Sequence, residues 1–596
     1  MTPGTPTPPP ETGVPSGERL DSWKEIADYL KRRVRTVQRW EKLEGLPVHR
    51  LQHDKQGTVY AWKGELDEWI RARDVPAEAS EAAEAGEAGE EEAGQAAAGV
   101  GQSARPGFRY RWPLLALAVL LIAGFAVFRS YWQPPVKVRV AVLPFKNLSG
   151  DPLQDYFTDG FTQEMISQVG RFNPERLGVI AWTSVERYKR NDRSAAEIAR
   201  ELRVHYILEG SIRREAGQVR VTAELIQAGD QTQVWTGSYQ RGLQDVLALQ
   251  NEVASSIAAE IRVHLSADRR GQPALARVAP EAHDAYLRGR FAWNRRTAEG
   301  IENSITFFQL AISLEPRYAL AYAGMADAYS LLGFYGALPP AEVYPAAKAA
   351  AEQALVLDPG QAEAHALLAD VTYLYDWNWP AAEASFERAI QLNPNYATAR
   401  QWYAMYLALM GRTDQALAET ERAAELDPLS LVIQADRAMS LYLARRYDLA
   451  IERCRSVLSL DQNFVLARAW LGLAELQKGN HAGAQAELER AAELAPGDPF
   501  VISILAYARA RAGDGQQARR LLQQLREMST ERYVSPAYFA LVYAGLGDND
   551  AAFEWAQKAY EERSPLLVRL KAEPMMDVVR GDPRFAALLK QVGLRE

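Results

Sequence analysis

Residues 379–396 read WPAAEASFERAIQLNPNY, and this pattern returns at a fixed interval along the second half of the chain. A residue able to end a helix recurs at Pro316, Pro359, Pro394, Pro428, Gln462 and Pro496. The spacings are 43, 35, 34, 34 and 34 residues, and the long first one is 34 plus an insertion around Tyr335–Pro345. A fixed period of this length is typical of repeat architectures.

Small and large apolar residues keep the same places in each repeat. The small ones are Ala382, Ala389, Ala416, Ala423, Ala450, Ala484, Ala491, Ala552 and Ala559, and Tyr373 and Phe386 hold larger positions. These positions resemble the tetratricopeptide (TPR) consensus. The resemblance implies about eight helix pairs over 283–565, a helical cap over 566–596, and a concave groove for a protein or peptide ligand.

Three residues of the repeats could have either a functional or a packing role. Cys454, the chain's one cysteine, falls at the packing position of Phe386, which favours a buried thiol over a redox sensor. Trp377 and Trp379 stand in the loop of one repeat, where packing is favoured over anchoring a partner.

Residues 18–74 predict a small basic and aromatic domain. Ser22 and Glu25 form a capping box at the start of a helix that reaches about Leu30. A basic turn follows, and then a second helix over residues 35–42. In this helix Val37 and Trp40 face inward, while Arg35, Gln38, Arg39 and Lys42 share the outward face.

A hairpin over 49–61, turning at Asp54–Gly57, and a third helix over 65–73 complete this domain. The stretch SWKEIADYLKRRVRTVQRWEKLEGLPVHRLQHDKQGTVYAWKGELDEWI resembles the winged helix-turn-helix of the MerR/excisionase class, although Arg32 and Arg33 stand where members have a small turn residue. The alternative is a degenerate module for protein contacts. The predicted DNA-contacting residues are Lys31, Arg32, Arg33, Arg35, Thr36, Gln38, Arg39, Lys42, His53 and Lys55.

The segments around this module are of simple composition. Residues 1–17 are rich in Pro, Thr and Gly and predict a disordered tail. Residues 75–107 predict a disordered acidic linker, because 77–100 hold seven glutamates and no Lys or Arg. That tract accounts for most of the formal charge of −8, so the whole-chain balance says little about partners.

Residues 112–132 predict a transmembrane helix. Trp112 to Phe128 carry no charge, and aromatic residues flank the run on both sides. Flanking arginines and lysines are nearly balanced, so charge does not set the orientation. Because a DNA reader must be cytoplasmic, we expect a single-pass protein of the inner membrane with its later domains outside the cytoplasm.

Residues 136–268 predict an α/β domain. Strands are expected over 138–145, 177–182, 205–214, 219–225 and 233–240, and helices over 155–169, 194–202 and 245–265. The segments VAVLPFKNLSGDPLQDYFTDG, VERYKR, ILEGSIRR and ALQNEVASSIA resemble the FlgO and TolB N-terminal class, which implies sensing or interaction without enzymatic chemistry. Asp151, Asp155 and Asp159 fit helix-start and turn chemistry better than a metal site.

No GxSxG, HExxH, CxxC, Walker or kinase motif occurs, so we expect no enzyme, no metal and no cofactor. The fold class is multidomain: a winged helix-turn-helix, one transmembrane helix, an α/β domain and an all-α TPR solenoid. The order of modules favours a membrane-anchored one-component transcription regulator, with DNA, a protein or peptide ligand, the membrane and a second copy of the chain as partners. Two alternatives stay open: a TPR scaffold for envelope complexes without specific DNA binding, and a re-entrant segment that leaves every soluble part cytoplasmic.

Overall fold

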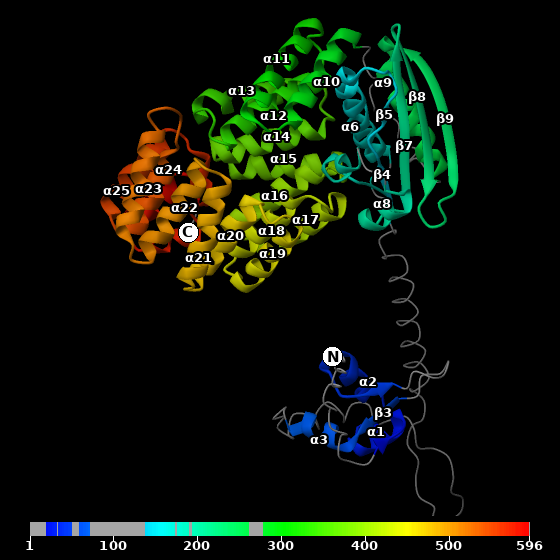
Figure 1. Cartoon of the computed structure of the whole chain (residues 1–596). Helices are drawn as coiled ribbons and strands as arrows, with labels where there is room; N and C mark the ends of the chain where they lie inside the picture. Colours follow the sequence, from blue (N-terminus) through cyan, green and yellow to red (C-terminus); the bar gives the residue numbers. More distant parts are fainter. Residues whose placement is uncertain are drawn as a thin grey trace, which may run out of the picture. The chain divides into compact units, whose positions relative to one another are not determined.

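The computed structural model describes residues 19–32, 34–50, 59–71, 137–172, 174, 176–189, 193–261 and 278–594. The chain divides into two compact units, Met1–Phe125 and Ala126–Glu596, and each is described by itself (Figure 1). The predicted tail 1–17, the linker 75–107 and the predicted span 112–132 lie outside the described residues. Among the described helices, none combines the length and apolar character needed to cross a bilayer.

The N-terminal unit is a small three-helix domain with a short antiparallel sheet in the order β1-β3-β2. Its elements are β1 (Arg19–Leu20), α1 (Trp23–Tyr29), α2 (Val34–Glu44), β2 (His49–Arg50), β3 (Val59–Trp62) and α3 (Lys63–Arg71). The buried core consists of Leu20, Ile26, Ala27, Val37, Leu46, Ala61 and Leu66. Each helix and strand β3 contributes to it, which explains how so short a chain segment holds three helices together.

The second unit begins with a mixed sheet in the order β6-β4-β7-β8-β9, with β5 paired to β7. Its strands are β4 (Val138–Val142), β5 (Lys146–Asn147), β6 (Leu177–Val179), β7 (Tyr206–Glu215), β8 (Gln218–Gln227) and β9 (Gln233–Gly242). Strands β6, β4 and β7 run parallel, and β7, β8 and β9 form an antiparallel meander. The expected strand over 138–145 therefore ends three residues early and is followed by the separate strand β5.

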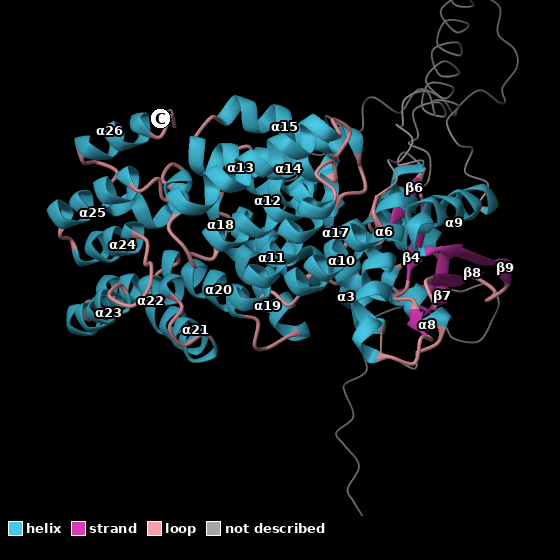
Figure 2. Ribbon diagram, turned by 90° about the horizontal axis from the view of Figure 1, so that it is seen from above, coloured by secondary structure: helices cyan, strands magenta, loops and turns pink. Residues whose placement is uncertain are grey.

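Helices cover the two faces of this sheet unequally, as Figure 2 shows. The longer helices α6 (Asp155–Phe172) and α9 (Val246–Glu260) pack on the face that buries Val140 and Val142. The other face buries Ala141 and Leu143 against α7 (Trp182–Val185) and α8 (Ala195–Leu202). The smaller elements of this domain are the 3-10 turns η1 (Pro152–Gln154), η2 (Glu186–Tyr188) and η3 (Leu243–Asp245).

Residues 278–594 continue as helices that stack in antiparallel pairs. Within this continuously described stretch there are eight pairs: α10 (Pro280–Asn294) with α11 (Ala298–Leu314), α12 (Ala319–Phe334) with α13 (Pro340–Leu357), α14 (Ala362–Val371) and its π-helical extension η4 (Thr372–Asp376) with α15 (Trp379–Leu392), α16 (Ala397–Leu409) with α17 (Thr413–Leu426), α18 (Leu431–Leu443) with α19 (Tyr447–Leu460), α20 (Val465–Gln477) with α21 (His481–Leu494), α22 (Pro499–Arg511) with α23 (Gly515–Met528), and α24 (Pro536–Leu546) with α25 (Asn549–Glu561).

The alanines that define the repeat pattern are buried between the paired helices; for example, Ala382, Ala389, Ala416 and Ala423 have no exposed surface. The insertion predicted around Tyr335–Pro345 does not form a long loop. Its residues instead lengthen the second helix pair, and Pro345 lies inside α13. Three short elements follow α25: η5 (Pro565–Arg569), η6 (Pro574–Val578) and α26 (Pro583–Gln591).

Candidate nucleic-acid interface and repeat groove

The first candidate site is the pair of helices α1 and α2. Ser22 caps α1 by accepting a hydrogen bond from the backbone N–H of Glu25 at 3.2 Å, and the Glu25 carboxylate accepts one from the N–H of Asp21 at 2.8 Å. Lys31 lies in the turn after α1 with a φ of 50°. A left-handed residue here ends α1 and lets the chain begin α2 three residues later. The basic turn therefore also serves as the structural turn.

Burial divides α2 into two faces. Val37 is fully buried, and the Trp40 ring lies 5.6 Å from the Trp69 ring of α3. Arg35 and Arg39, four residues apart and hence on one stripe of the helix, are both exposed. The predicted inward and outward faces of this helix are confirmed at these four positions.

The other predicted DNA-contacting residues have mixed outcomes. Thr36 and Gln38 are half-buried beside the arginine stripe, and Lys31 is exposed. Arg32 is half-buried and donates a hydrogen bond from Nη1 to the backbone oxygen of Lys31 at 3.2 Å. Arg33, His53, Lys55 and the side chain of Lys42 lie outside what the structure describes.

Strands β2 and β3 form the base of the predicted hairpin, with His49 opposite Tyr60 and Arg50 opposite Val59. The predicted turn at Asp54–Gly57 lies outside the described residues. The His49 ring stacks on Tyr60 at 5.2 Å, and its Nε2 lies 2.7 Å from the Glu65 carboxylate. His49 therefore has a structural partner, and no cluster of metal-ligating side chains occurs among the described residues.

In the α/β domain the three spaced aspartates have distinct structural roles. Asp151 caps the turn η1. Asp155 and Asp159 both pair with Lys189, at 3.1 and 2.8 Å. Burial raises the pKa of Asp159, and the ammonium group of Lys189 opposes that shift. The sequence predicted helix-start chemistry here but missed Lys189, which lies 30 residues away.

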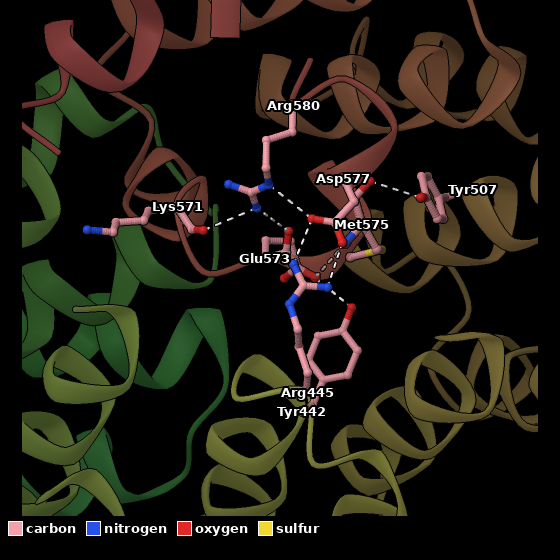
Figure 3. A network of polar contacts seen from close by, with 8 residues as sticks. All are labelled: Tyr442, Arg445, Tyr507, Lys571, Glu573, Met575, Asp577 and Arg580. Atoms are coloured by element: carbon pink, nitrogen blue, oxygen red, sulfur yellow. Dashed lines mark hydrogen bonds and ion pairs between the residues drawn. The ribbon is translucent and has the colours of Figure 1, made fainter. Parts of the chain in front are cut away.

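The second candidate site is the groove of the repeat array, which residues 564–594 enter. We call these residues the C-terminal segment. The Tyr442 hydroxyl donates to Glu573 Oε1 at 2.6 Å, and the Arg445 guanidinium makes two hydrogen bonds to Asp577 at 2.6 and 2.8 Å (Figure 3). The Tyr507 hydroxyl donates to the backbone oxygen of Met575 at 2.9 Å. The array must therefore curve around this segment.

The two tryptophans of the third repeat belong to the same assembly. Trp379 is 8% exposed and donates from Nε1 to the backbone oxygen of Val592 at 3.0 Å. The Trp377 ring stacks on Tyr560 of α25 at 5.3 Å. Both rings are thus used in packing the last repeat and the C-terminal segment against the third repeat, as the packing interpretation predicted. This part of the predicted peptide groove already holds a segment of the chain itself.

The α/β domain docks on the turns between successive repeats. Asn395 donates from Nδ2 to the backbone oxygens of Gly170 and Leu177, at 2.9 and 2.7 Å. One repeat later, the buried Asp427 carboxylate accepts hydrogen bonds from the hydroxyls of Thr183 and Ser184. The Pro-containing turns that revealed the period are therefore also the docking points of the preceding domain.

Three segments of the chain match known protein families. Residues 136–256 match the family described as HilA/YgeH-like transcriptional regulator, second domain. Residues 385–418 and 467–498 match tetratricopeptide repeats. Fold and matches together define a protein in which an α/β domain precedes a TPR region. More particularly, the α/β domain matches the HilA/YgeH-like regulator family over residues 136–256, and the motifs of the sequence had suggested a resemblance to the FlgO and TolB N-terminal class.

A curated relative, "Putative adenylate cyclase 3" of Rhizobium meliloti (strain 1021), is 36% identical over 194 residues, which are 32% of this chain and 33% of that protein. The match thus spans about a third of the relative's length.

Solved structures with some likeness include PilF of Pseudomonas aeruginosa, with 19% identity, a TM-score of 0.27, and coverage of 34% of this chain and 91% of that one. Another is the human IFIT1 dimer with m7Gppp-AAAA, with 15% identity, a TM-score of 0.37, and coverage of 52% and 78%.

Proposed function

We propose that this protein is a membrane-anchored, one-component transcription regulator that reads DNA through α2. The observation that carries the proposal is the exposed pair Arg35 and Arg39 on the face of α2 opposite the buried Val37. A short helix that follows a tight turn and exposes arginines is suited to the major groove, where Arg pairs with guanine edges. The HilA/YgeH-like second domain, a transcription-regulator module, supports the same function.

The proposal includes a single membrane span at residues 112–132, with the N-terminal unit in the cytoplasm and residues 133–596 outside it. An uncharged run of this length supports the span. Proteolysis of intact spheroplasts provides the test. Residues 133–596 should be cut from outside, and their full protection would contradict this topology and favour the re-entrant alternative.

The proposal assigns no catalytic role to the chain, although a relative bears a cyclase name. The match to that relative covers 194 residues, so it does not carry the relative's activity to this protein. Within the α/β domain Lys189 is engaged in ion pairs with Asp155 and Asp159. We propose instead that this domain and the repeats bind protein partners.

Selection of bound sequences from a randomised DNA duplex library tests the DNA-reading function. The full chain in detergent should enrich a shared motif, and Arg35→Ala/Arg39→Ala should abolish the enrichment, because both changes remove groups that can contact bases. Lys24→Ala is the matched control, since Lys24 is an exposed cation on α1 outside the proposed reading stripe. Equal enrichment by wild type and double variant, or none by either, would contradict the proposal.

A further inference from the structure

A cavity of about 100 Å³ lies where the C-terminal segment meets the last helix pair. Helices α24 and α25 form one wall, with Leu541 and Phe553 among its residues. Elements η5, η6 and α26 form the other wall, with Leu570, Met576 and Phe585 among its residues. The cavity therefore depends on the return of the segment to the repeat array, which the repeat pattern alone does not indicate.

The lining of this cavity is predominantly apolar, and part of that apolar surface is left uncovered by the chain. Leu541, Phe553 and Met576 pack against the core and yet stay half-buried. Covering apolar surface of this kind gains free energy in proportion to the area removed from water. Because apolar cavities offer water few hydrogen-bond partners, the lining favours an apolar occupant over water.

Three polar residues also line the cavity, and together they carry no net charge. Arg569 donates to Glu573 Oε2 at 3.1 Å, and its guanidinium carbon lies 4.8 Å from the centre of the Trp470 ring. Glu573 also accepts a hydrogen bond from the Tyr442 hydroxyl at 2.6 Å (Figure 3). Burial raises the pKa of Tyr538, so its hydroxyl stays neutral. A charged ligand would therefore lose its hydration without meeting an unpaired opposite charge.

The size of the cavity fits a small molecule better than a peptide. An apolar cavity of roughly 150 Å³ holds benzene, and this cavity is of the same order. The C-terminal segment already runs through the groove beside it, where its backbone accepts hydrogen bonds from Tyr507 and Trp379. A peptide would have to displace this segment, whereas a single ring or a short alkyl chain would not.

We propose that this cavity binds a small uncharged apolar molecule, of the size of one aromatic ring. The ligand contacts α24 and α25 on one side and η6 and α26 on the other, so its binding ties the C-terminal segment to the last repeat. In a one-component regulator such a ligand is a signal. That role rests on the proposed function, whereas the site itself rests on the geometry of the cavity.

Methyl resonances of the full chain in detergent, labelled with ¹³C at its methionine methyl groups, provide the test. Toluene should shift the resonance of Met576, which lines the cavity, in a saturable way. The resonance of Met165, which is fully buried in the α/β domain, should not move. Benzylamine and benzoate carry the same ring with a charge and should bind at least about tenfold more weakly. This measurement does not involve DNA, so its failure is distinguishable from failure of DNA reading.

A variant that fills the cavity locates the binding. Ala556 lines it from α25, so Ala556→Leu should abolish the Met576 shift without lowering the unfolding temperature, because the added carbons occupy apolar space. Gln557→Leu, at the exposed neighbouring position, is the matched control and should keep the shift. If Ala556→Leu does not fold, the three probes compared on the wild type still decide.

Three results would each overturn the proposal. The first is a Met576 resonance that toluene leaves unchanged or that moves no more than that of Met165. The second is a shift that a folded Ala556→Leu chain retains. The third is binding of benzylamine or benzoate as tight as that of toluene.

Discussion

Asp370 shows how the repeat array keeps a carboxyl group almost out of water. It is 7% exposed and accepts a hydrogen bond from Ser330 at 2.9 Å. Burial raises its pKa to about 7; the bond from Ser330 opposes that shift, and the nearby carboxylate of Asp327 adds to it. Burial likewise raises the pKa of Asp436 to about 7, while Gln401 donates to it at 2.6 Å.

A raised folded-state pKa makes stability depend on pH in a defined direction. The contribution of Asp370 is fully present below about pH 4, where both states are protonated, and is lost as pH rises to about 7. Asp370→Asn does not titrate, so we expect it to be more stable than wild type by about 2 kcal/mol at pH 8, with the difference shrinking toward pH 4.

Thermal unfolding across this pH range measures that difference. The exposed Asp414→Asn serves as the control and should show no such trend. A difference between Asp370→Asn and wild type that stays constant from pH 4 to 8 would contradict the assignment of a buried, neutral Asp370.

Removing the Tyr442 hydroxyl tests whether its contact with Glu573 holds the C-terminal segment in place. Tyr442→Phe removes the hydrogen bond to Glu573, which is 5% exposed, and should cost about 1–3 kcal/mol of the free energy of unfolding. Chemical denaturation provides the measurement. Tyr335→Phe, on a half-exposed ring, should change little. An unchanged stability for Tyr442→Phe would mean that the segment is not held at this position.

At the scale of single helices, local sequence patterns correctly predicted which residues are buried and which are exposed. The periodicity of α2 placed Val37 in the core and Arg35 at the surface because a helix separates its faces every 3.6 residues. Cys454 is fully buried, as its repeat position predicted, and burial raises the pKa of its thiol to about 12.

The contacts that shape the candidate sites escaped prediction because they join distant residues. Trp379 meets Val592 across 213 positions, and Tyr442 meets Glu573 across 131. A repeat pattern says that each helix pair packs on its neighbours, but the curvature that brings the last repeat back to the third is the sum of many small rotations. No local signal in the sequence therefore marked the C-terminal segment as the occupant of the groove.

The docking of the α/β domain on the repeat turns leads to a prediction at the same scale. Asp427→Ala leaves the buried Ser184 hydroxyl without this acceptor and should destabilise the chain by about 2 kcal/mol. Asp461→Ala is the matched control, because this aspartate holds the equivalent place one repeat later and accepts a bond from Asn463 in its own turn. Thermal unfolding and limited proteolysis between the two domains should distinguish the variants; equal behaviour would contradict a docking role for Asp427.

For the whole molecule, the modules suggest how a signal and a DNA site are connected. The α/β domain and the repeats form one compact unit, Ala126–Glu596, held by contacts such as Arg171 with Glu363 at 2.9 Å. In the proposed function, a protein or peptide that binds this unit would be the signal that changes DNA binding by the N-terminal unit. If the proposed regulator acts as a dimer, two copies would bind two half-sites with a gain in effective concentration, and DNA occupancy should then rise with dimerisation.

Genomic occupancy of the tagged full-length protein is the most direct test of the central claim, that α2 reads specific DNA. Wild type should give discrete peaks that share a sequence motif, and Arg35→Ala/Arg39→Ala, expressed to the same level, should lose them. Peaks that persist in the double variant, or a wild-type profile no different from background, would contradict the claim and favour a TPR scaffold without specific DNA binding.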